Sequence, residues 1–135
     1  MFIKHTKWAL LWAMLIFILC AIPGKDIPFI GIWDLFNLDK LIHASLFFIQ
    51  VVLLIQGFSK QTQIILFSRR PKLFAVGLCI MYGGDLELMQ GAFFTDRTAD
   101  IYDFIANSLG AVAGALLFEK IFNKYESWAK KRTPH

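Results

Sequence analysis

Four long apolar segments, separated by shorter charged ones, constrain this chain more than any other feature. A helix needs about 20 apolar residues to cross the ~30 Å hydrocarbon core of a bilayer. We expect such helices at about residues 5–23, 41–58, 73–91 and 101–122, followed by a basic tail at 123–135. With 57% hydrophobic and 18% charged residues, the chain is more apolar than a soluble domain of its length needs to be. The sequence therefore predicts an all-α membrane protein, a bundle of about four transmembrane helices forming a single domain over 1–135.

The first apolar segment ends at Pro23-Gly24 and is short unless it extends back to Phe2. That extension includes Lys4 and Lys7, whose long side chains can reach the interface. The alternative is a cleaved signal peptide with these lysines at its basic end, although the cleavage site would be poor. Whether the first helix is retained stays open.

The distribution of basic residues predicts the orientation. One side of the expected bundle carries eleven of them: Lys4, Lys7, Lys60, Arg69, Arg70, Lys72, Lys120, Lys124, Lys130, Lys131 and Arg132. The other side carries three: Lys25, Lys40 and Arg97. Because basic residues mark cytoplasmic loops, both termini are predicted to be cytoplasmic. The net charge of +4 is thus explained by topology, and we expect no nucleic acid partner.

Unusual polar residues gather on the predicted extracytoplasmic side. They are Asp39, Lys40, His43, Asp85, Glu87, Gln90, Asp96, Arg97, Asp100, Asp103 and Asn107. Ionisable groups at membrane depth are costly, usually face the bundle interior and mark functional sites. The candidate binding residues are therefore Lys40, His43, Glu87, Gln90, Arg97, Asp103 and Asn107.

Helical spacing predicts which of these residues share a face. Asp39 and His43 are four apart on the second helix. On the third helix Gly83, Glu87 and Gln90 share a face, as do Gly84 and Glu87, whereas Asp85 points elsewhere. The fourth helix carries one stripe of Asp103, Asn107, Gly110 and Gly114. We assign Gly83, Gly84, Gly110 and Gly114 to helix packing, since small residues let helix backbones approach closely.

Several roles remain open at this point. Asp39 could be only the N-cap of its helix, and His43 could be bonded back to Asp39 or contact a ligand. Glu87 could act in function or form an ion pair with Arg97 that closes the bundle. Arg97 could instead present its guanidinium fork to a phosphate or an anionic headgroup.

Catalytic and metal signals are weak. His43, Glu87 and Asp103 could form a metal site, but there is one histidine and no paired ligand spacing, so we expect no metal and no cofactor. No nucleophile elbow, phosphate-cradling glycine loop or dinucleotide fingerprint occurs. Cys20 and Cys79 lie in apolar segments and are expected to be small buried apolar residues that form no disulfide. The catalytic candidates are restricted to Glu87 and His43 as an acid–base pair.

Two ordered motifs resemble the VanZ-like family. The first is Asp39-Lys40-Leu41-Ile42-His43, similar to the family's D-K-x-x-H entry to a transmembrane helix. The second is Glu87-x-x-Gln90, then Arg97, then Asp103-x-x-x-Asn107-x-x-Gly110-x-x-x-Gly114. The resemblance covers about residues 8–120, and Asp85 departs from it. It implies a small multi-pass protein of the bacterial cytoplasmic (inner) membrane and cell envelope, in a family whose namesake is linked to resistance to the glycopeptide antibiotic teicoplanin.

Three functions are compatible with this pattern. We favour a non-enzymatic protein that binds a membrane lipid, an envelope lipid or a lipid-linked envelope precursor through the polar residues. The alternatives are an intramembrane enzyme acting on a lipid-linked or phosphorylated substrate, and a structural subunit whose acids and arginine only hold the bundle closed.

Overall fold

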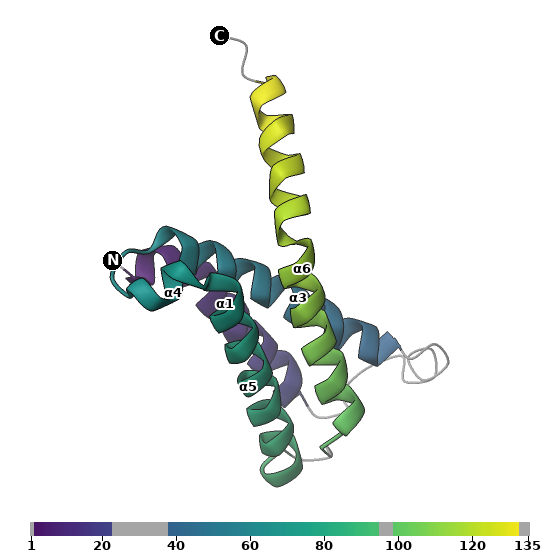
Figure 1. The fold of residues 1–135 in the computed structure, drawn as a ribbon. Coiled ribbons are helices and arrows are strands. Elements are labelled where there is room, and N and C mark those ends of the chain that lie inside the picture. The colour runs from purple at the N-terminus through teal and green to yellow at the C-terminus, as the bar shows by residue number, and fades with distance from the viewer. Residues whose placement is uncertain (1, 23–37, 95–98, 133–135) are drawn as a thin grey trace.

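The computed structural model describes residues 2–22, 38–94 and 99–132, with side chains described at 2–22, 39–94 and 99–124. These parts of the chain are helical and contain no strand (Figure 1). The helices are α1 (Phe2–Ala21), α3 (Leu38–Lys60), α4 (Ile65–Arg69), α5 (Pro71–Ala92) and α6 (Ile101–Arg132). The predicted all-α bundle is confirmed.

Four of these helices are long and apolar enough to cross a membrane: Phe2–Ala21, Asp39–Lys60, Pro71–Ala92 and Ile101–Lys124. Their outer faces expose large apolar side chains, such as Leu88 at 71% and Leu116 at 73%. Such side chains covering all four long helices are typical of surfaces that face lipid. The fold is thus that of a multi-pass membrane protein, and the side on which each terminus lies stays a prediction.

Local sequence explains where several helices begin and end. Pro71 occupies the first turn of α5, where its missing N–H leaves no hydrogen bond unmade. The segment 59–72, expected as a loop, contains the short helix α4, whose Ile65 and Leu66 are exposed. α6 continues to Arg132 and does not end near residue 122 as predicted, because no proline occurs before Pro134 and Gly114 is the last glycine.

The second long helix, α3, lies at the centre of the bundle. It packs most extensively against α6 and also against α1 and α5, whereas α1 and α6 make no contact within the described chain. Its buried side chains include Phe47, Val51 and Ile55, all at most 1% exposed. The last turns of α6 project beyond the other helices (Figure 1).

The α3–α6 interface depends on two glycines of α6. A Cβ at Gly110 would meet backbone atoms of Ala44, with its C atom 2.7 Å away. A Cβ at Gly114 would lie 2.9 Å from the carbonyl oxygen of Phe48. Both distances are shorter than real Cβ contacts, so only glycine permits this approach, as the small-residue stripe predicted.

Polar side chains of the other helices attach α1 to the bundle through its backbone carbonyls. Gln50 donates to Ala9 O at 3.2 Å, Tyr82 to Ala13 O at 2.6 Å and Gln90 to Cys20 O at 3.2 Å. In return, Trp12 Nε1 donates to Leu46 O at 2.9 Å. α1 is therefore held by more than the apolar packing that its sequence alone indicates.

Candidate functional site: a polar cluster above an apolar groove

The start of α3, the end of α5 and the start of α6 bring seven polar residues together at one end of the bundle. We call them the polar cluster: Asp39, Lys40 and His43 of α3, Glu87 of α5, Asp100 at the start of α6, and Asp103 and Asn107 of α6. His43, Glu87, Asp103 and Asn107 are all buried. The helices hold these groups at fixed positions in the interior, where polar groups need partners.

Asp100 is both a helix cap and a counter-ion. Its Oδ1 accepts the backbone N–H of Tyr102 at 2.8 Å, which is the bond expected of an N-cap two residues ahead. Its Oδ2 accepts from Lys40 Nζ at 2.7 Å. The bond from Lys40, followed by the bond from Tyr102, lowers the pKa of the Asp100 carboxyl below its usual value.

Lys40 connects α3 to the start of α6. Its ammonium donates to Asp103 Oδ1 as well as to Asp100, and Asp39 Oδ2 lies 3.7 Å away. The side chain is 31% exposed. Lys40, predicted as a group that binds a ligand, is thus already paired with two carboxylates.

His43 is oriented by Asn107. Its Nδ1 lies 3.0 Å from Asn107 Oδ1, and because a carbonyl oxygen only accepts, Nδ1 carries the hydrogen. Its Nε2 lies 3.7 Å from Asp39 Oδ1 and 3.6 Å from Asp103 Oδ2. These distances are too long for hydrogen bonds, so Nε2 faces two carboxylates without bonding to either.

Glu87 lies beside this group on α5. Its Oε2 accepts the backbone N–H of Asp100 at 3.0 Å, whereas its buried Oε1 has no hydrogen-bond partner among the residues that the structure describes. The carboxylate interacts electrostatically with Asp103 and His43. A buried acid that is only half satisfied is costly in stability, and such groups cluster at functional sites.

The other predicted site residues lie around the cluster. Gln90 bonds to α1 rather than to the cluster. Gly83 packs against Asn107 and Phe47, Gly84 against Phe104, and Asp85 is exposed on another face, as its spacing predicted. Arg97 lies outside the described residues, so its pairing with Glu87 stays a prediction. The N-cap hypothesis for Asp39 is wrong, because α3 already begins at Leu38.

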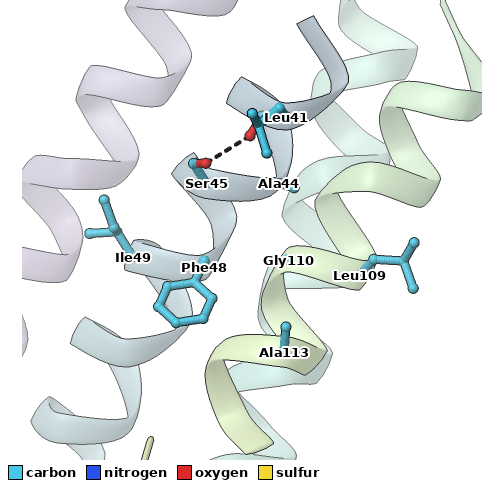
Figure 2. Close-up of a pocket in the computed structure, with 8 residues that line it drawn as sticks. All are labelled: Leu41, Ala44, Ser45, Phe48, Ile49, Leu109, Gly110 and Ala113. Carbon is cyan, nitrogen blue, oxygen red and sulfur yellow. Dashed lines mark hydrogen bonds between the residues drawn. The ribbon is translucent and has the colours of Figure 1, made fainter. Parts of the chain in front are cut away.

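An apolar groove of about 460 Å³ runs between α3 and α6 (Figure 2). Its lining residues are Leu41, Ala44, Ser45, Phe48, Ile49, Leu109, Gly110 and Ala113. The Ser45 hydroxyl donates to Leu41 O at 2.7 Å, so the only hydroxyl in the lining is already satisfied. The volume is within the range of ligand pockets, and the lining suits a hydrocarbon chain.

The polar cluster and the groove are formed by the same two helices. Lys40 is one turn before Ala44 on α3, and Asp103 is two turns before Gly110 on α6. Along the helix axes, Lys40 and Asp103 therefore lie about 6–10 Å from these two groove residues. The charged residues lie beyond one end of the groove, whose own lining is uncharged.

Three atoms of the cluster could hold a metal ion. Asp39, His43 and Asp103 each offer one ligand atom, and these atoms lie within 4.8 Å of one another. This set differs from the one considered from the sequence, because Asp39 takes the place of Glu87.

The sequence predicts Asp100 near the site but assigns it no role. A signal for its capping role was present, since Asp100 and Asp103 precede the apolar run of the last helix with the spacing of a capping box. It predicts the cap, but not the bond to Lys40 sixty residues earlier.

Comparisons with protein-family models, curated proteins and solved structures find no match to this chain.

Proposed function

We propose that this multi-pass membrane protein binds an amphiphile, with its hydrocarbon chain in the α3–α6 groove and its polar head at the polar cluster. The amphiphile is a membrane lipid or a lipid-linked envelope precursor. The observation that carries the proposal is the stacking of a buried charged cluster on an apolar groove along the same two helices. An amphiphile has the same division into a polar and an apolar part.

The groove supports this proposal because it opens on the lipid-facing side of the bundle. Leu41 and Leu109 at its edges are 61% and 63% exposed. A lipid chain could enter sideways from the bilayer without any helix moving. Gly110 lies in the groove lining, where its contact with the Ala44 backbone brings α3 and α6 close together.

The VanZ-like resemblance is part of the proposal and fits with it. It would place the chain in the bacterial cytoplasmic membrane with the polar cluster at the extracytoplasmic face, where envelope precursors are found. A role in glycopeptide resistance would follow from the resemblance alone, and no residue of the groove or the cluster favours it.

An intramembrane enzyme is the second candidate, favoured by one observation. The Oε1 of Glu87, near His43 and without a hydrogen-bond partner in the described part of the chain, resembles a general base positioned to accept a substrate proton. A nucleophile within reach of either group would strengthen this candidate, and none lies among their hydrogen-bond partners in the described chain.

The proposal is tested by filling the groove. Ala113→Trp places an indole between α3 and α6, whereas Val112→Trp places the same indole one residue away, outside the groove lining. Both proteins and the parent are purified from the same membranes in a mild detergent. Lipid retained per protein is then measured by native mass spectrometry.

We expect the parent and Val112→Trp to retain the same lipid and Ala113→Trp to lose it. Equal retention by all three folded proteins would refute the groove as the binding site. Turnover of a lipid phosphate that disappears in Glu87→Gln would favour the enzymatic candidate instead.

A further inference from the structure

The polar cluster contains more carboxyl groups than basic groups. Among its described residues, Lys40 is the only lysine or arginine beside the carboxylates of Asp39, Glu87, Asp100 and Asp103, and the His43 imidazole is the only other basic side chain. The connecting segments 23–37 and 95–98 add three acidic and two basic residues by sequence, so they do not reverse the excess. An uncompensated negative charge at membrane depth is costly, and it would repel the phosphate of an amphiphile.

The histidine of the cluster points its free nitrogen at this excess. With Nδ1 donating to Asn107, Nε2 is the ring nitrogen that faces Asp39 Oδ1 and Asp103 Oδ2. The His43 side chain is 9% exposed, so little water reaches these three atoms. A metal cation between them would be bound by one imidazole nitrogen and two carboxylate oxygens.

Lys40 does not occupy that position. It contacts Asp39 and Asp103 through their other oxygens, Oδ2 and Oδ1. Each of these two carboxylates therefore offers one oxygen to the ammonium and one to the space in front of His43 Nε2. The lysine orients the two acids and leaves their second oxygens available.

We propose that Asp39, His43 and Asp103 bind a divalent transition metal ion, which in turn accepts a phosphate oxygen of the amphiphile. Zinc bound by imidazole and carboxylate at 2.0–2.2 Å has ligand atoms about 3.3–3.5 Å apart in a tetrahedral site. The distances from Nε2 of 3.6 and 3.7 Å need to shorten by only a few tenths of an ångström, and the two carboxylate oxygens lie within 4.8 Å of each other. Three protein ligands leave a fourth position open for the phosphate.

Asn107 is the outer partner that such a site requires. Histidine ligands usually donate their second N–H to an oxygen, which fixes the ring and the tautomer. The bond from His43 Nδ1 to Asn107 Oδ1 is of this kind. The proposal rests on the proposed function for the phosphate, but the metal site itself does not need an amphiphile.

The first experiment measures the metal alone. The full chain carrying a tag without histidines is purified in detergent, treated with chelator, and titrated with zinc chloride and with manganese chloride in a calorimeter. We expect one ion per chain, and at least ~100-fold weaker binding in His43→Gln, because loss of an outer partner alone costs 10–100-fold. His5→Gln is the matched control, since it makes the same change near the N-terminus, and it should bind as the parent does.

Asp39→Asn keeps the test decisive if His43→Gln fails to fold, because Asp39 is 52% exposed and its loss leaves no buried group unpaired. The same weakening is expected for it, whereas the exposed Asp85→Asn should have no effect. Equal binding by parent and Asp39→Asn, or no binding by the parent, would overturn the metal site.

The second experiment adds short-chain phosphatidylglycerol to the protein with and without the metal. We expect binding that needs the metal. Lipid binding that is equal in both conditions would overturn the bridge and leave the proposed function standing. Metal binding without any lipid binding would refute the proposed function and leave the metal site standing.

Discussion

Gly110 offers the sharpest test of how α3 and α6 are packed. Replacing it with alanine would put Cβ 2.7 Å from Ala44 C and 2.8 Å from Ala44 Cα. These are backbone atoms that no rotamer change can remove. Restoring an ordinary contact of 3.4 Å to Ala44 C requires the helices to separate by at least about 0.7 Å, and Ala44 O, which lies closer still, requires more. This separation affects the most extensive helix interface of the described chain.

Two opposing effects determine how much the free energy of unfolding falls in Gly110→Ala. Overpacking a well-packed interface costs about 1–3 kcal/mol, and the backbone clash places Gly110→Ala near the upper end. Replacing glycine with alanine inside a helix returns up to about 1 kcal/mol. We therefore expect the free energy of unfolding to fall by about 2 kcal/mol.

Gly77 provides the matched control, because nothing lies within 4 Å of the Cβ that Gly77→Ala would add. This variant should be equal to the parent or up to about 1 kcal/mol more stable. The difference between the two variants then isolates the packing effect, at about 3 kcal/mol.

Unfolding by sodium dodecyl sulfate from mixed micelles measures both variants. Tryptophan fluorescence reports the transition, since Trp12 bonds across the α1–α3 interface. A Gly110→Ala protein as stable as Gly77→Ala would refute the close approach of α3 and α6.

The remaining predictions concern polar contacts. Lys40→Met leaves the carboxylate of Asp103, which is 12% exposed, without its cation, so the same titration should show a loss of about 2–3 kcal/mol; an unchanged midpoint would show that the pair contributes nothing. Tyr82→Phe removes the bond to α1 and should lose about 0.5–1.5 kcal/mol, whereas Tyr102→Phe, which is 67% exposed, should be neutral; equal effects would contradict the bond. Folding lowers the pKa of Asp100 below its ordinary value of 3.8. The ionised Asp100 carboxylate therefore stabilises the folded protein above pH 3.8, and this stabilisation is lost as the pH falls through the lower pKa of the folded state. As the pH is lowered from 5 to 3, the midpoint temperature of thermal unfolding should therefore fall less steeply in Asp100→Asn than in the parent. Identical slopes of this midpoint against pH would exclude a role for the Asp100 carboxylate.

Much of the fold could be predicted because the membrane restricts the choice of structure. A segment such as 41–58 has to be a helix in lipid, since its backbone groups need internal partners. Pro71 marked the start of α5, and the spacing of Gly110 and Gly114 marked the tight interface. These are local signals, and each can be interpreted from a single helix.

The rest depends on contacts between helices. The bonds of Lys40 to Asp100 and Asp103 join residues sixty positions apart, and spacing along one helix carries no information about them. The groove likewise arises from the sizes of side chains on α3 and α6 after the two helices meet. The extension of α6 to Arg132 was missed because hydropathy reports where the membrane ends, not where the helix ends.

The central claim, that an amphiphile lies in the α3–α6 groove, is tested most directly by a phospholipid carrying a photoreactive diazirine on its acyl chain. The protein is reconstituted with it, irradiated and digested, and the labelled residues are identified by mass spectrometry. We expect labels concentrated on residues 41–49 of α3 and 109–113 of α6, and their loss in Ala113→Trp. Labels spread equally over the exposed faces of α1 and α5, and unchanged in that variant, would contradict it.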